Sequence, residues 1–66
     1  MKITVNGKSQ LVEPSCTAAQ LVELMGISSG RIAMEVNQEI VPRSTYEQYS
    51  FEDNDVVEIV HAVGGG

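Results

Sequence analysis

The stretch CTAAQLVELMG, residues 16–26, carries the clearest structural signal in this chain of 66 residues. Thr17 stands three positions before Gln20, which is the spacing of a capping box at the start of a helix. The cysteine before it and the first leucine after it occupy the two positions of a hydrophobic staple, and apolar residues then recur at helical spacing. Gly26 is placed to end the helix in a left-handed conformation. The stretch therefore predicts one amphipathic helix.

The residues before the helix predict a hairpin. Residues 1–5 alternate between apolar and polar side chains, and Asn6-Gly7 is typical of a two-residue turn. That turn sets a register in which Val12 faces the core and Leu11 the opposite side. A three-residue loop would exchange the two faces of the second strand, and the turn chemistry favours the first register.

Three further strands are predicted after the helix. Residues 32–36 alternate, residues 39–41 form a short strand that Pro42 stops, and residues 56–63 are the most strongly strand-forming run of the chain. Residues 44–49 read as a turn or a single helical turn that carries the two tyrosines over the core. Met25 and Met34 are expected to fill the core.

The order of these elements predicts an α+β fold in which one helix packs across a mixed sheet. The last strand is expected in the middle of the sheet, beside the first. We expect one domain over residues 1–61 and a flexible glycine tail over residues 62–66, because glycine gives a strand no packing and loses the most backbone freedom on ordering.

Composition excludes several classes of function. Nine acidic and four basic residues give a net charge of −5, which argues against nucleic acid as a partner. A single cysteine excludes an internal disulfide, and the chain has no signal peptide, no long apolar run and no zinc-like spacing. These features indicate a cytoplasmic protein with no membrane partner. A chain of this size has little room for a deep active-site cavity.

Two local features carry a resemblance to a known family. The run NQEIVPR, residues 37–43, and the ending Val63-Gly64-Gly65-Gly66 resemble the ThiS family of sulfur carrier proteins, which have the β-grasp fold of ubiquitin. A terminal pair of glycines is common to all β-grasp sulfur carriers and ubiquitin-like modifiers. The IVPR run and the short length favour ThiS, and Gly64 is a third glycine where many relatives need two.

The resemblance implies a protein co-substrate for thiamine thiazole biosynthesis rather than an enzyme. In the family's scheme the carboxylate of Gly66 attacks ATP on a ThiF-like adenylating enzyme, which consumes the ATP. A cysteine desulfurase or another persulfide donor then supplies sulfur, and the resulting thiocarboxylate serves a ThiG-like thiazole synthase. No cofactor and no metal is expected on the carrier itself, and none of its residues is catalytic.

The tail fits this scheme on physical grounds. Five extended residues span about 17 Å, so Val63, Gly64, Gly65 and Gly66 could enter a partner's active site while the domain stays outside. Glycine passes through a narrow channel in conformations closed to other residues. A frayed terminus without function is the competing interpretation of the tail taken alone.

Two other classes of function stay open from the sequence. The same chemistry could serve molybdopterin synthase, cysteine synthesis or tRNA thiolation. The chain could also be a ubiquitin-like modifier or an interaction module that never bears sulfur.

The open face of the sheet is the expected docking surface. Val56, Val60 and Leu11 would lie there as an apolar patch with an acidic rim, and we expect both enzymes to dock on it in turn.

Other residues of chemical interest have a simpler structural interpretation. His61 is about 17 Å from Gly66 in an extended chain, too far for a general base. Cys16 is expected to be a small buried apolar residue, with a reactive thiol as the lesser alternative. Glu52, Asp53 and Asp55 do not fit a calcium loop and are expected to form a solvated turn.

Overall fold

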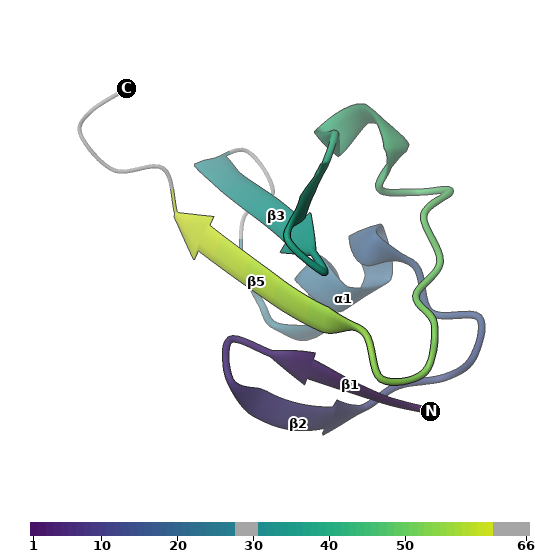
Figure 1. The fold of residues 1–66 in the computed structure, drawn as a ribbon. Coiled ribbons are helices and arrows are strands. Elements are labelled where there is room, and N and C mark those ends of the chain that lie inside the picture. Colours follow the sequence, from purple (N-terminus) through teal and green to yellow (C-terminus); the bar gives the residue numbers. More distant parts are fainter. Residues whose placement is uncertain (28–30, 62–66) are drawn as a thin grey trace.

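The computed structural model describes residues 1–27 and 31–61, the last of these for its backbone alone. One helix lies across one face of a five-stranded mixed sheet (Figure 1). In chain order the elements are β1 (Lys2–Val5), β2 (Lys8–Leu11), α1 (Ala18–Leu24), β3 (Ile32–Val36), β4 (Glu39–Val41), the 3-10 helix η2 (Arg43–Thr45) and β5 (Val56–His61).

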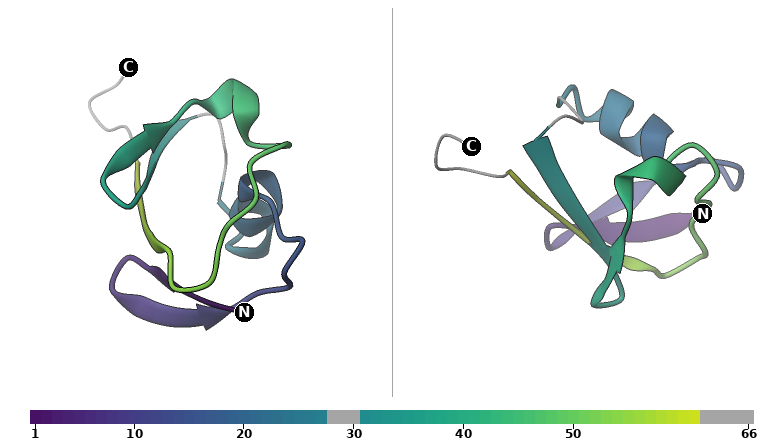
Figure 2. Two further views of the ribbon diagram at one scale, coloured as in Figure 1. Left: turned by 45° about the vertical axis from the view of Figure 1, so that its right-hand side comes forward. Right: turned by 90° about the horizontal axis from the view of Figure 1, so that it is seen from above.

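The strands are arranged in the order β2-β1-β5-β3-β4. The last strand therefore lies in the middle, parallel to β1 on one side and antiparallel to β3 on the other. Seen from above, α1 lies to one side of the sheet and leaves the opposite face uncovered (Figure 2). This arrangement confirms the predicted α+β fold with a central final strand.

The first hairpin has the two-residue turn that the sequence favours. Asn6 and Gly7 both have positive φ, at 51° and 83°, as that turn requires. Val5 pairs with Lys8, so the register is the predicted one. The side chain beyond the second strand, Val12, is consequently buried, while Leu11 on the opposite face is 80% exposed.

Both ends of the helix match the local sequence signals. The Gln20 amide N–H donates to Thr17 Oγ1 at 3.2 Å, and the Thr17 amide N–H donates to Gln20 Oε1 at 3.0 Å. Gly26 has a φ of 69°, and the Ile27 N–H returns to the carbonyl of Val22 at 3.4 Å, closing the helix in a Schellman motif.

The segment after η2 ties the start of the helix to the rest of the fold. The amides of Ala18 and Ala19, which have no partner within a helix, donate to the carbonyls of Tyr49 and Tyr46 at 2.8 and 3.0 Å. Tyr46 is buried, and the ring of Tyr49 meets Phe51 edge to face with centroids 5.7 Å apart. The tyrosines thus lie over the core, as predicted for this segment.

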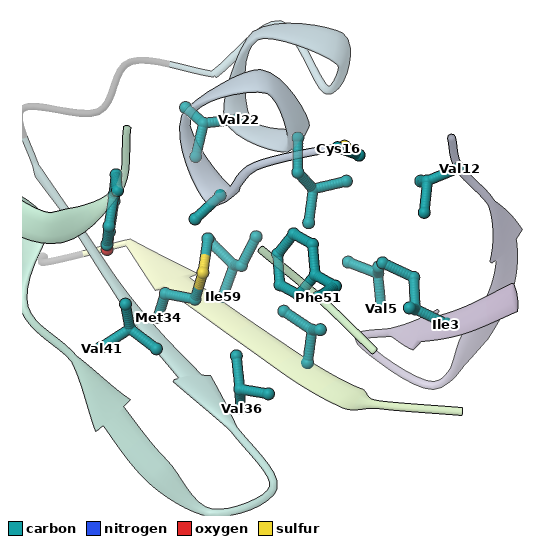
Figure 3. Close-up of a cluster of buried hydrophobic side chains, with 14 residues drawn as sticks. Ile3, Val5, Val12, Cys16, Val22, Met34, Val36, Val41, Phe51 and Ile59 are labelled. Atoms are coloured by element: carbon teal, nitrogen blue, oxygen red, sulfur yellow. The ribbon is translucent and has the colours of Figure 1, made fainter. Parts of the chain in front are cut away.

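The core fills the space between α1 and the sheet. In Figure 3, Met34 and Ile59 point from the sheet toward the helix that carries Val22. Each large apolar side chain buried in this way contributes about 1.5 to 3 kcal/mol. Among the described residues, the largest fully buried side chains are Ile3, Leu21, Met34 and Val57.

The acidic turn before β5 differs from its prediction as a solvated turn. Glu52 and Asp53 are exposed, but Asp55 is buried at 8% exposure. Its Oδ2 accepts from the amide of Glu52 at 2.8 Å, and its Oδ1 accepts from Asn37 Nδ2 at 3.0 Å. Asp55 therefore joins the β3–β4 turn to the start of β5. Its partner Asn37 lies 18 residues away, beyond the reach of local pattern analysis.

Candidate functional site

The predicted reactive segment begins where the described structure stops. Residues 62–66, with Val63, Gly64, Gly65 and Gly66, lie outside the described residues, so the boundary between domain and tail stays a prediction. What the structure places is the strand that leads into them. The carboxyl end of β5 lies on the far side of the molecule from the N-terminus (Figure 1).

Strand β5 is held on both sides. It pairs with β3 over five positions, from Val36↔Val57 to Ile32↔His61. With β1 it pairs at two positions only, the last of them Val5↔Val57. The start of β5 thus lies between two strands, and the end that leads into the following residues pairs with β3.

The three predicted docking residues are exposed on the uncovered face of the sheet. Leu11, Val56 and Val60 are 80%, 47% and 58% exposed, while Val57 and Ile59 on the same strand face the core. This division confirms the faces of β5 and of the hairpin that alternation predicted.

The three residues do not form one continuous patch. Leu11 pairs with Lys2 on β1, and Val56 lies beside Thr4 of the same strand. Val56 and Val60 are about 13 Å apart along β5, with one outward-facing residue between them. The outer face therefore presents apolar side chains interspersed with polar ones.

Two acids and one further apolar residue also lie on this face. Glu58, between the two valines, is directly opposite Glu35 of β3, which in turn is opposite Ile40 of β4. The acids thus lie in the centre of the outer face, whereas the sequence analysis expected acids at its rim. Ile40 is 70% exposed and was missed by the sequence reasoning. The sequence did contain a signal for it: neighbouring strand residues face opposite sides, so a buried Val41 places Ile40 on the outer face.

Cys16 has the environment of a structural cysteine. Its side chain is 4% exposed, and Sγ lies 3.5 Å from the carbonyl oxygen of Thr17, to which it donates. Burial, and after it the negative charge of Glu13, raises the pKa of the thiol above its ordinary value of 9.0. The neutral thiol therefore predominates at neutral pH, as expected for a cysteine buried in the apolar core.

Other kinds of site have no support in the described residues. Over residues 1–27 and 31–61, no three His, Cys, Asp or Glu side chains are grouped so that they could hold a metal ion. In the same part of the chain no helix is long and apolar enough to span a bilayer.

Comparisons with known proteins agree with the observed fold. A family model described as the ThiS family matches residues 3–66. The chain is 32% identical to the sulfur carrier protein ThiS of Bacillus subtilis over 65 residues, which cover 97% of this chain and 98% of that one. The crystal structure of the thiamine biosynthesis protein ThiS from Geobacter metallireducens superposes with a TM-score of 0.84 at 29% identity, with both chains fully covered.

A longer relative matches the whole chain as well. The chain is 41% identical over 66 residues to a thiazole synthase of Paramagnetospirillum magneticum. It spans only 20% of the length of that synthase.

Proposed function

The chain belongs to the ThiS family, and from this membership we propose that it carries sulfur for the thiazole ring of thiamine. The observation that carries the proposal is the end-to-end match with the Bacillus subtilis sulfur carrier. The family model extends to Gly66, where the chemistry would take place.

The reactive group in this proposal is the α-carboxylate of Gly66. With a reference pKa of about 3.3 to 3.7 it is ionised at neutral pH, so its oxygen can act as a nucleophile while its carbon is poorly attacked by other nucleophiles. On a ThiF-like enzyme its oxygen attacks the α-phosphate of ATP and expels pyrophosphate, which leaves an acyl-adenylate. Activation thus turns an unreactive carboxylate into an acyl group with AMP as leaving group.

Sulfur then replaces one carboxylate oxygen. The terminal sulfur of a persulfide, from a cysteine desulfurase or a similar donor, attacks the acyl carbon and expels AMP to form an acyl disulfide. A thiol opens that disulfide and leaves the thiocarboxylate on Gly66. ATP and free thiols are both present in the cytoplasm, where we place the reaction. In this scheme the chain is a co-substrate, and its partners catalyse each step.

We assign a ThiG-like thiazole synthase as the acceptor of the sulfur. The thiazole synthase of Paramagnetospirillum magneticum supports this assignment, because a fifth of that protein resembles this whole chain. In that synthase a carrier-like sequence and the synthase share one polypeptide. A separate carrier would have to dock on the synthase to deliver the same group.

The outer face of the sheet is our proposed docking surface. Leu11, Val56 and Val60 supply exposed apolar area there, with Ile40 at the far side. The glycines would reach from this surface into the partner's active site over about 17 Å when extended.

The test is adenylation by a purified ThiF-like enzyme with α-labelled ATP. The full chain should become labelled. A chain that ends at Gly65 should give a product whose tail is too short to deliver sulfur for thiazole formation. The decisive comparison is a chain with an added residue after Gly66, in which the bulky terminus should block labelling. Equal labelling of that extended chain would refute the assignment of Gly66.

A further inference from the structure

Strand β5 continues past the end of its neighbour β1. The β1–β5 ladder ends at Val5↔Val57, whereas the ladder to β3 continues for four more residues of β5, to Ile32↔His61. One side of β5 is therefore paired along its length, and the other side is paired only at its beginning.

Directly after β1, the side chain of Asn6 takes the place of a strand residue and bonds to β5. Asn6 Oδ1 accepts from the amide of Ile59 at 2.8 Å, and Asn6 Nδ2 donates to the carbonyl of Ile59 at 3.2 Å. One amide side chain thus bonds both backbone groups of Ile59, as a paired strand residue would. After Asn6 the chain turns away through Gly7 and enters β2.

The direction of the next backbone groups follows from the alternation along β5. The carbonyls of Asp55 and Val57 accept from β1 and its turn at 2.9 Å each. Val56, between them, exchanges both of its bonds with Asn37 on the β3 side. Successive residues of a strand direct their N–H and C=O to opposite sides. His61, two residues after Ile59, therefore directs both groups to the β1 side.

No strand of the described residues pairs with His61 on that side. Its N–H and C=O form a short open edge at the carboxyl end of β5, directly before the residues that would enter a partner in the proposed function. An open edge of this kind is a template for a strand from another chain.

We propose that an extended segment of the ThiF-like adenylating enzyme pairs with β5 at His61, next to the amide of Asn6. This inference rests on the proposed function, because the occupant is the enzyme that acts on Gly66. The added strand would fix the direction in which the following residues leave the domain. The position is favoured over other edges because it is continuous with the segment that the enzyme must receive.

Chemical synthesis of the 66-residue chain allows a direct test. An ester in place of the amide between Val60 and His61 removes the N–H of His61 and keeps every side chain. With purified ThiF-like enzyme, the KM for this chain should rise about fivefold, as expected for one net hydrogen bond, while kcat at saturation is kept. The matched control has an ester between Ile59 and Val60, which removes an N–H that faces β3. Compared with the His61 ester, that control should lower the unfolding temperature more and change the KM less.

The outcomes separate this inference from the proposed function. An unchanged KM for the His61 ester, with normal labelling of Gly66, overturns the strand pairing and leaves the function standing. Absence of labelling in the unmodified chain overturns both. A self-association of the unmodified chain that the His61 ester abolishes would assign the edge to a second copy of this chain, and would also overturn the proposal.

Discussion

Asn6 contributes both to the hairpin turn and to β5, the strand that leads into the tail. Its backbone has the positive φ of the hairpin turn, and its side chain bonds both backbone groups of Ile59. Sequence analysis identified the turn, because Asn-Gly is a local signal. It could not identify the bonds to Ile59, because the two residues are 53 positions apart and meet only in the folded sheet.

Replacing Asn6 with glycine separates the two contributions. Glycine tolerates the positive φ but has no amide, so the chain should lose about 1 to 2 kcal/mol of unfolding free energy. Urea unfolding measures the change. The control is Asn54→Gly, because Asn54 also has positive φ, at 73°, and within the described residues no hydrogen bond joins its side chain to β5. An equal effect of both changes would contradict the role of the amide.

The raised pKa of the Cys16 thiol predicts how the unfolding free energy changes with pH in the alkaline range. Because burial and Glu13 raise the pKa of its thiol, the folded chain keeps the proton at a pH where the unfolded chain has lost it. The unfolding free energy should therefore be highest below the ordinary pKa of 9.0 and should fall as the pH rises above it. Cys16→Ala should reduce the steepness of that fall, measured by urea unfolding between about pH 8 and pH 10. Parallel curves for the two chains would refute this.

At the level of elements, local signals predicted most of the fold. The capping box, the Asn-Gly turn and the alternation in β3 and β5 each lie within a few residues of sequence, and each was confirmed. Alternation also gave the faces of β5 correctly. It could not give the neighbours across the sheet, because these depend on the register between strands that are distant in sequence. The pair of Glu35 and Glu58 and the burial of Asp55 were missed for this reason.

The facing acids on β3 and β5 should weaken the sheet. Like charges directly opposite each other are unfavourable, by about 0.2 to 1 kcal/mol. Glu35→Gln should therefore raise the unfolding free energy slightly, and more so at low salt, where screening is weak. The control is Glu23→Gln on α1, which makes the same change of charge away from this pair. A stabilisation of equal size in both would indicate net charge as the cause.

For the whole molecule, the proposed function assigns the docking surface to the described body and the chemistry to the tail. The fold and the family could be predicted from the sequence because turns, caps and the IVPR run are local. Which apolar residues of β5 and the hairpin face outward was also predicted, but their spacing across the sheet was not, because it depends on how five strands assemble.

The docking surface makes a prediction at this scale. Val60 is 58% exposed on the outer face, so Val60→Asp should leave the unfolding temperature nearly unchanged. It should weaken binding to the adenylating enzyme and to the thiazole synthase by about tenfold, as the loss of an apolar contact residue does. Calorimetric titration measures both affinities. Lys8→Asp, on the β2 edge of the sheet, is the control, and unchanged affinity of the Val60 variant for either enzyme would remove that enzyme from this face.

The central claim is that Gly66 bears the sulfur, and intact-protein mass spectrometry tests it most directly. The chain is incubated with ThiF-like enzyme, ATP and a persulfide donor, and the product is fragmented to locate any change. The account predicts a mass increase equal to the exchange of one oxygen for sulfur, confined to Gly66. Sulfur bound at Cys16 with an unchanged Gly66 would contradict it.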